Sequence, residues 1–87
     1  MRRRVVVSGR VQGVFFRDTV RSIAEREGLA GWVRNNPDGT LEAVFEGAPA
    51  AIDRAVALCH EGPPAAQVQR LEAFDEPEEG LGTFRIR

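Results

Sequence analysis

The order in which strand-like and helix-like apolar spacings follow one another limits this fold more than any other feature of the sequence. Residues 3–9 contain three consecutive valines, a pattern typical of a well-covered central strand. From Phe16 the apolar residues recur at i, i+4, i+7 and i+8, which is the spacing of a helix, and Gly28 is suited to end that helix. The chain therefore begins with a strand followed by a helix.

Two further strands are predicted before a second helix. The first covers about residues 30–36, and the turn after it contains Pro, Asp and Gly, each favourable there for a different physical reason. The next strand alternates clearly, with one face formed by Leu41, Ala43 and Phe45 and the other by Thr40, Glu42, Val44 and Glu46. This pattern indicates a strand with one apolar face.

The second half of the chain repeats the helix and strand signals. Pro49 is suited to the first turn of a helix, the Gly-Pro-Pro at 62–64 ends it, and its buried stripe is predicted to be Ile52, Ala55, Val56 and Cys59. Strands are predicted at 67–74 and around 84–86, separated by an acidic loop at 75–79. The order predicts an α+β fold, the ferredoxin-like split β-α-β sandwich, with an antiparallel sheet covered on one face by two helices.

Length and residue types exclude several classes of protein. The 87 residues suffice for one domain, and no apolar run approaches the roughly 20 residues that span a bilayer. The apolar run at the N-terminus stops at Ser8, which is too short for a signal peptide, so we expect a cytoplasmic protein. A single cysteine allows no internal disulfide. Cys59 and His60 are neighbours that point in different directions on a helix, and we expect no metal and no cofactor.

The charge distribution favours a small anionic ligand over nucleic acid. The net charge of −1 argues against a general nucleic-acid binder. Residues 1–40 hold eight Arg and four acids, or +4, whereas residues 41–87 hold four Arg and nine acids, or −5. An anion is therefore drawn toward the N-terminal half. We expect a monomer.

The segment between the first strand and the first helix has the features of an anion site. No proline interrupts the amides from Arg10 to Phe15, and Gly13 permits a backbone conformation largely closed to other residues. At a helix N-terminus, successive N–H groups and the helix dipole favour one bound anion. Arg17, in the first turn, has no acidic residue three or four positions later and can add a bidentate guanidinium.

Three better-known phosphate loops are excluded. The segment lacks the Gly-Lys-Ser/Thr ending of nucleotide-binding loops, and Gly9 and Gly13 do not fit G-x-G-x-x-G. A thiol-based phosphatase needs a cysteine where Val11 stands, six residues before Arg17. The sequence therefore predicts a phosphate-sized site without a covalent thiol intermediate.

Two separate motifs resemble the signatures of the acylphosphatase family. The first is Val7-x-Gly9-x-Val11-Gln12-Gly13-Val14-x-Phe16-Arg17, and the second is Gly31-Trp32-Val33-Arg34-Asn35 followed by Gly39 and Gly47. The resemblance covers essentially all of residues 1–87 as one acylphosphatase-like domain. One departure is Leu41, where the family pattern usually has valine.

The resemblance implies an enzyme that hydrolyses acyl phosphates without a metal, acting on a small acyl phosphate and on neither nucleic acid nor membrane. Arg17 would bind the substrate phosphate, and Asn35 would position the attacking water. Backbone amides would complete the phosphate site, those of Gln12, Gly13, Val14, Phe15, Phe16 and Arg17. Gly39 and Thr40 would support the site from outside.

Other interpretations of these residues stay open. Arg17 could belong to an ordinary surface ion pair, and Asn35 could simply lead into the following turn. Cys59 is interpreted as a core residue, His60 as a helix C-terminal residue and Trp32 as a packing residue. The chain could instead be a non-catalytic anion-binding ferredoxin-like module, or an acylphosphatase-like accessory domain of a larger enzyme. Because the motifs contain no general base, we expect a phosphate oxygen of the substrate to accept the water's proton.

Overall fold

The strands and helices follow the order expected from the sequence, and the computed structural model describes the whole chain, Met1 to Arg87. Their bounds are β1 Arg2–Arg10, α1 Phe16–Glu27, β2 Ala30–Asn35, β3 Leu41–Glu46, α2 Pro49–Glu61, β4 Gln67–Glu76 and β5 Phe84–Ile86. The acidic stretch starts within β4, because Asp75 and Glu76 pair with β1 instead of opening a loop. Neither helix is long and apolar enough to cross a membrane.

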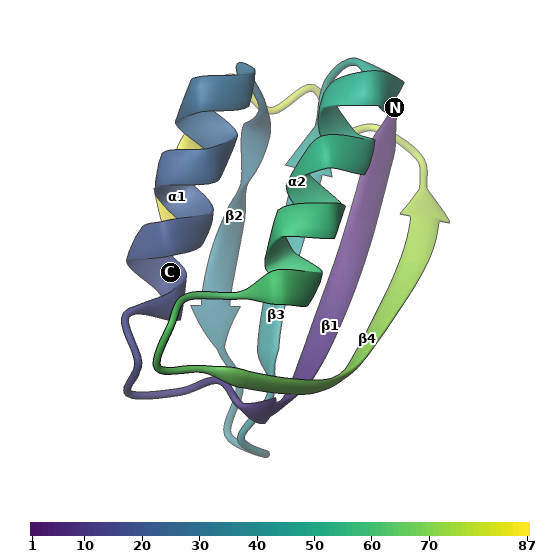
Figure 1. Ribbon diagram of the computed structural model, residues 1–87. Coiled ribbons are helices and arrows are strands. Elements are labelled where there is room, and N and C mark those ends of the chain that lie inside the picture. The colour runs from purple at the N-terminus through teal and green to yellow at the C-terminus, as the bar shows by residue number, and fades with distance from the viewer.

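One five-stranded sheet carries both helices on the same face (Figure 1). The strands are ordered β4-β1-β3-β2-β5, so β3 is the central strand, with β1 and β2 on either side of it. β1 pairs antiparallel with β3 and β4, and β2 pairs antiparallel with β3. The α+β ferredoxin-like arrangement predicted from the sequence is confirmed.

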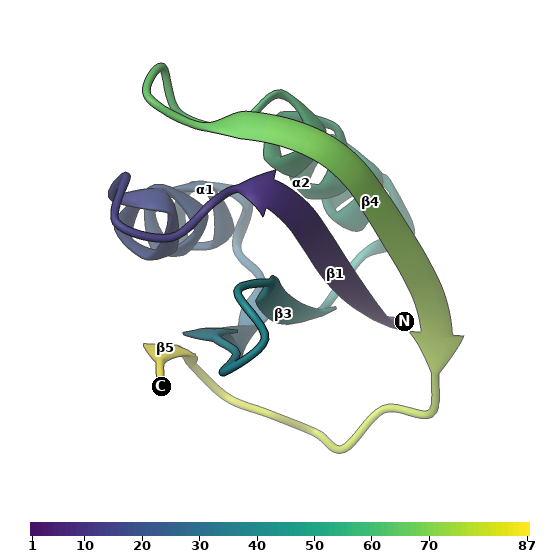
Figure 2. The same ribbon diagram turned by 90° about the horizontal axis from the view of Figure 1, so that it is seen from below.

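The short strand β5 corrects the expectation of a wholly antiparallel sheet. It pairs in parallel with β2, with Gly31 opposite Phe84 and Val33 opposite Ile86, so the sheet is mixed. Residues 77–83 carry the chain from one edge of the sheet to the other, on the side away from the helices (Figure 2). After that crossing β5 runs in the direction of β2.

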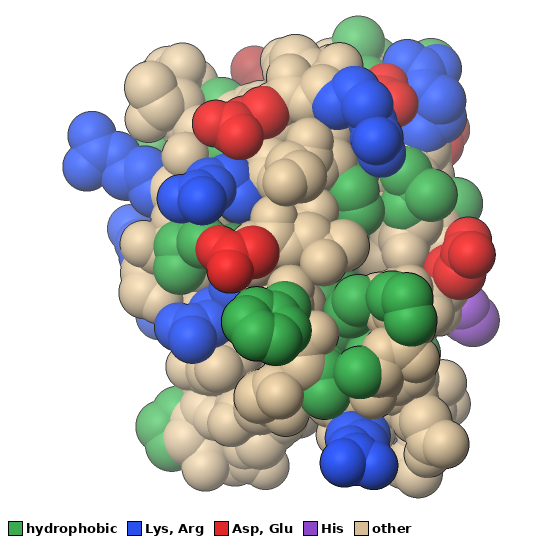
Figure 3. All heavy atoms as spheres, turned by 60° about the vertical axis from the view of Figure 1, so that its left-hand side comes forward, with side chains coloured by type: hydrophobic (Ala, Val, Ile, Leu, Met, Phe, Trp, Pro, Cys, Tyr) green, Lys and Arg blue, Asp and Glu red, His purple; other side chains and the backbone are tan.

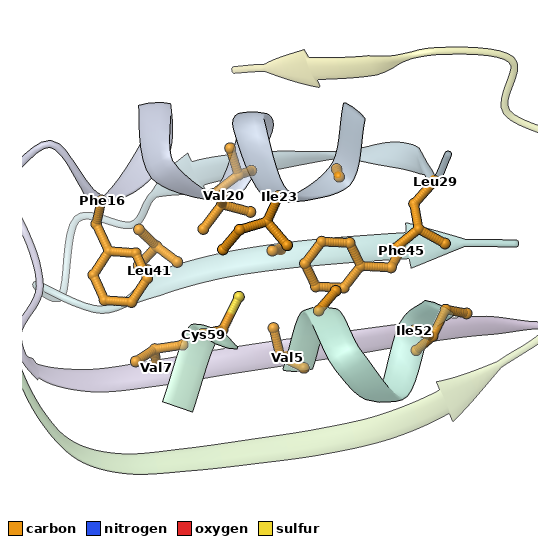
Figure 4. Close-up of a cluster of buried hydrophobic side chains, with 14 of the residues drawn as sticks. Val5, Val7, Phe16, Val20, Ile23, Leu29, Leu41, Phe45, Ile52 and Cys59 are labelled. Atoms are coloured by element: carbon orange, nitrogen blue, oxygen red, sulfur yellow. The ribbon is translucent and has the colours of Figure 1, made fainter. Parts of the chain in front are cut away.

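The hydrophobic core lies between the helices and the sheet. In Figure 4, side chains from both helices point toward those of the central strands. Phe16, Val20 and Ile23 of α1 are buried as their spacing predicts. On α2 the buried residues are Ala51, Ile52, Ala55 and Cys59, while Val56 is partly exposed and packs at the margin of the core. The expected interpretation of Cys59 as a core residue is confirmed.

The face of the sheet without helices is covered by paired charges instead. β3 is buried on both faces, although its alternating sequence predicts one exposed face. Glu42 receives the guanidinium groups of Arg34 at 3.0 Å and of Arg4 at 3.4 Å from the flanking strands. The long arginine side chains cover β3 while their charged ends remain near solvent.

Glu46, at the end of β3, holds the connection between β4 and β5 in place. Its carboxylate accepts backbone N–H bonds from Glu79, Gly80 and Leu81 at 2.9–3.1 Å and pairs with Arg2 at 2.8 Å. Burial disfavours ionisation of the carboxyl group, but the N–H donors and the Arg2 guanidinium outweigh it and lower the Glu46 pKa to about 2. This contact fixes the approach to β5, which forms one wall of the site described below.

Candidate active site

The loop between β1 and α1 presents backbone N–H groups that no carbonyl of the chain accepts. None of the N–H groups from Val11 to Phe15 donates a hydrogen bond within the chain, and the first N–H groups of α1 have no partner in the preceding turn. Val11 and Val14 are buried and anchor the loop to the core. Gly13 has a φ of 71°, the left-handed conformation that its sequence context predicts. The loop therefore has the free donors that an anion site requires.

Arg17 lies in the first turn of α1, with its side chain exposed. It takes part in no ion pair or side-chain hydrogen bond, whereas the neighbouring Asp18 pairs with Arg21 at 3.7 Å. The alternative that Arg17 belongs to a surface ion pair is therefore wrong. Its guanidinium is free to bind an external anion at the helix end where the dipole also favours one.

Asn35 is the last residue of β2 and lies on the face of the sheet that carries the helices, two positions after the core residue Val33. Its side-chain oxygen, Oδ1, is buried and accepts no hydrogen bond within the chain. Buried polar atoms without a partner are rare, and each costs about 1–3 kcal/mol. The Asn35 Oδ1 is therefore an acceptor that the fold leaves without a partner within the chain.

One cavity of about 400 Å³ brings these features together. It is lined by Val11, Gly13, Phe15, Phe16, Arg17, Asp18, Asn35 and Ile86. Figure 3 shows the side of the molecule where α1 and β5 lie; hydrophobic side chains gather in its lower half and a basic one lies below them. The end of β2 thus meets the loop after β1, as the resemblance requires for Arg17 and Asn35 to act on one ligand.

Gln12 contributes a contact that sequence reasoning missed. Its side-chain amide donates to the backbone carbonyls of Asn36, at 2.8 Å, and Thr40, at 3.1 Å. These two residues flank the turn that follows Asn35, and the Thr40 hydroxyl and N–H lower the pKa of Asp38 within it. Gln12 therefore ties the loop after β1 to the turn that follows Asn35.

The predicted site residues divide by their place relative to the cavity. Gly13, Phe15, Phe16, Arg17 and Asn35 line it. The other four lie outside the lining. Val14 is in the core, and Gln12 is in the loop after β1 with its side chain bonded to the next turn. Gly39 and Thr40 are in that turn, between β2 and β3.

Val11, Asp18 and Ile86 line the cavity but were not among the predicted site residues. The position of Asp18, directly after Arg17, could have indicated that it lies at the cavity. Ile86 reaches the cavity through the parallel pairing of β5 with β2, which the sequence does not show.

The remaining candidate reactive groups lie elsewhere. Cys59 is fully buried, and burial raises the pKa of its thiol to about 12, so it is not a nucleophile. His60 is in the last turn of α2 and does not line the cavity. Trp32 packs on the opposite face of the sheet, between the guanidinium groups of Arg34 and Arg87, which agrees with its interpretation as a packing residue.

Among solved structures similar to this chain, one has the same fold over nearly its whole length, and another has it in a small part of a larger protein. The crystal structure of the acylphosphatase from Bacillus subtilis has a TM-score of 0.95 at 37% identity, covering 99% of this chain and 97% of that one. Full-length HypF, crystallised in its phosphate- and nucleotide-bound form, has a TM-score of 0.92 at 30% identity, covering 99% of this chain but 11% of that one.

Similar sequences agree with the structural likeness. The acylphosphatase of Rubrobacter xylanophilus is 62% identical over 77 residues, which are 88% of this chain and 70% of that protein. That of Gloeobacter violaceus is 54% identical over 86 residues, which are 99% and 92% of the two chains. The acylphosphatase family profile matches residues 3–86. The chain therefore belongs to the acylphosphatase family.

Proposed function

We propose that the cavity hydrolyses acyl phosphates to a carboxylate and inorganic phosphate, with Arg17 binding the phosphate and Asn35 positioning the attacking water. The N–H groups of residues 12–17 complete the phosphate site. Membership in the acylphosphatase family supports this reaction. The observation that carries the assignment is that Asn35, whose buried Oδ1 has no hydrogen-bond partner within the chain, and the unpaired Arg17 line the same cavity.

The two side chains suit different parts of the reaction. A planar guanidinium matches two phosphate oxygens at once and stays charged throughout. An asparagine oxygen accepts a hydrogen bond from water and so fixes its orientation, but an amide is too weak a base to remove the proton. Asn35 is therefore a water-positioning residue, and the chemistry depends on orientation and charge stabilisation.

The reaction needs no general acid or base from the protein. The water oxygen forms a bond to phosphorus as the bond between phosphorus and the acyl oxygen breaks. The leaving carboxylate takes the electron pair of that bond and is too weak a base to require protonation. A phosphate oxygen of the substrate takes the proton of the water. Arg17 and the loop N–H groups stabilise the charge on the phosphoryl group during transfer.

The cavity lining supports a metal-independent reaction. Asp18 is the one residue of carboxylate, imidazole or thiol type in the lining. That carboxylate is paired with Arg21 at 3.7 Å, no group of three or more metal-ligating side chains lies together in the structure, and the positive charge at the cavity is that of Arg17.

A non-catalytic role is the second candidate, favoured by the likeness to HypF. That likeness covers 11% of the HypF chain, so the same fold also occurs as a small part of a much larger protein. An anion-binding accessory module would use the loop and Arg17 but would place no demand on Asn35. The unpartnered Asn35 oxygen favours the enzyme.

The test is hydrolysis of benzoyl phosphate by the purified chain in the presence of a metal chelator. We expect turnover that the chelator does not reduce. Phosphate binding without hydrolysis would support the accessory module, and turnover abolished by the chelator and restored by a divalent cation would overturn metal independence. The single domain over 1–87, the monomeric state, the cytoplasmic location and the absence of nucleic-acid or membrane binding stay predictions.

A further inference from the structure

Phe15 has an arrangement that phosphate binding alone does not explain. Its side chain is 81% exposed, the most exposed large hydrophobic group of the protein. Its backbone has φ 61° and ψ 24°, and it is the one residue other than glycine with a positive φ. A bulky side chain in this conformation costs roughly 1–2 kcal/mol. The fold therefore keeps a strained backbone and an exposed apolar ring at the same position.

The strain has a geometric consequence. Val14 and Phe16, on either side, are both buried in the core. With Phe15 in the left-handed conformation as α1 begins, both neighbours are buried while the Phe15 side chain is exposed. Asparagine or glycine would adopt this conformation at lower cost, so backbone geometry gives no reason for an aromatic residue here.

The Phe15 ring lies at the border between two hollows. It lines the 400 Å³ cavity that holds Arg17 and Asn35, and also an adjoining shallow hollow of about 330 Å³ along the outer side of α1. Ile23 adds an apolar group to the second hollow, and Ile86 adds one to the first. Because Phe15 and Arg17 line the same cavity, the ring adjoins the space next to a phosphate bound by Arg17.

We propose that the Phe15 side chain contacts the acyl group and gives the enzyme a preference for acyl phosphates with a large apolar or aromatic acyl group. This inference rests on the proposed function, because it assumes that Arg17 binds the phosphate end. The ring adds apolar contact and offset or edge-to-face packing to an aromatic acyl group. An acetyl group is too short to gain much from it.

The test compares benzoyl phosphate with acetyl phosphate in wild type, Phe15→Asn and Phe15→Tyr. Asparagine tolerates the left-handed backbone but removes the ring, whereas tyrosine keeps an aromatic ring. We expect the ratio of kcat/KM for benzoyl over acetyl phosphate to fall roughly five- to tenfold in Phe15→Asn and to recover in Phe15→Tyr. Phe15→Asn is also expected to melt at a higher temperature, since it relieves the strain.

The matched control is Phe74→Asn, which removes the other exposed phenylalanine, on the opposite face of the sheet beneath Arg4. It is expected to leave the ratio unchanged. An equal loss for both substrates in Phe15→Asn, or no loss for either, would overturn the role in acyl selectivity while leaving the proposed function intact. No hydrolysis by wild type would overturn both. An unchanged ratio together with self-association of wild type that Phe15→Asn abolishes would assign the ring to contact with a second copy.

Discussion

Replacing Glu46 by glutamine tests whether the link between β3 and the β4–β5 connection is an electrostatic one. The substitution keeps the shape of the side chain but removes its charge. The Glu46 carboxylate is 6% exposed and accepts bonds from the Arg2 guanidinium and from the N–H groups of Glu79, Gly80 and Leu81. A glutamine oxygen can retain part of this set, and its amide NH₂ group cannot accept the rest.

The expected loss follows from the pKa of the carboxyl group. A fall from 4.5 to about 2 on folding corresponds to roughly 3 kcal/mol at neutral pH. Because a glutamine oxygen keeps part of the hydrogen-bond set, we expect a loss of about 2 kcal/mol, or about 8–16 °C in melting temperature for a chain of this size. Because the pKa is lower in the folded state, this stability is fully present above about pH 4.5 and is lost as the pH falls toward 2.

The assay is urea unfolding of wild type and Glu46→Gln between pH 7 and pH 2. We expect Glu46→Gln to be less stable at pH 7, and the difference to shrink below pH 4.5 until little of it is left at pH 2. Glu72→Gln is the matched control, since Glu72 pairs at 3.2 Å with Arg70 and both side chains are exposed; it is expected to change stability little. A difference of the same size at pH 7 and pH 2, or none at pH 7, would refute the reasoning.

Three further predictions concern packing, positioning and reactivity. In Gly31→Ala the new Cβ would lie 1.8 Å from the Val44 carbonyl oxygen, so the variant should fail to fold. Gly80 also has a positive φ, but nothing lies within 4 Å of an added Cβ, so Gly80→Ala should lose only about 1 kcal/mol of unfolding free energy by thermal melting. Equal losses of stability in the two variants would contradict this. Gln12→Ala should lower kcat/KM roughly ten- to hundredfold with a small change in melting temperature, and Gln12→Glu, which cannot donate the two hydrogen bonds, should not restore it. Unchanged kinetics would remove the positioning role. Cys59, fully buried with a thiol pKa of about 12, should react with a thiol reagent at pH 8 only after urea is added; rapid labelling of the folded protein would count against the described core.

The fold could be predicted from local patterns where the contacts are local. The helical spacing from Phe16, the glycine after α1 and the turn before β3 are all properties of neighbouring residues. The free guanidinium of Arg17 was also readable, because the residues one turn later carry no acid. These features need no knowledge of which strand pairs with which.

The remainder depends on contacts between distant residues. The link from Gln12 to the Thr40 carbonyl joins residues 28 positions apart, and that from Glu46 to Leu81 joins residues 35 apart. In the sequence, Glu46 is simply one of the polar residues of an alternating strand. In the structure it is buried and paired with Arg2. Ile86 lines the cavity because β5 pairs in parallel with β2, and no spacing in the sequence carries that information. The exposure of the Phe15 ring depends on the positive φ of that residue. The surrounding motif is apolar, and its sequence gives no sign that one of its aromatic side chains is exposed.

The division of work between Arg17 and Asn35 is tested most directly by measuring turnover of benzoyl phosphate and binding of inorganic phosphate in the same variants. Arg17→Ala should lower turnover by at least about 10²–10³ and weaken phosphate binding. Asn35→Ala should lower turnover strongly while phosphate binds within about twofold of wild type. Arg54→Ala, on α2 and paired with Glu27, controls for loss of an arginine and should change neither. Wild-type turnover in Asn35→Ala, or unchanged phosphate binding in Arg17→Ala, would contradict the account.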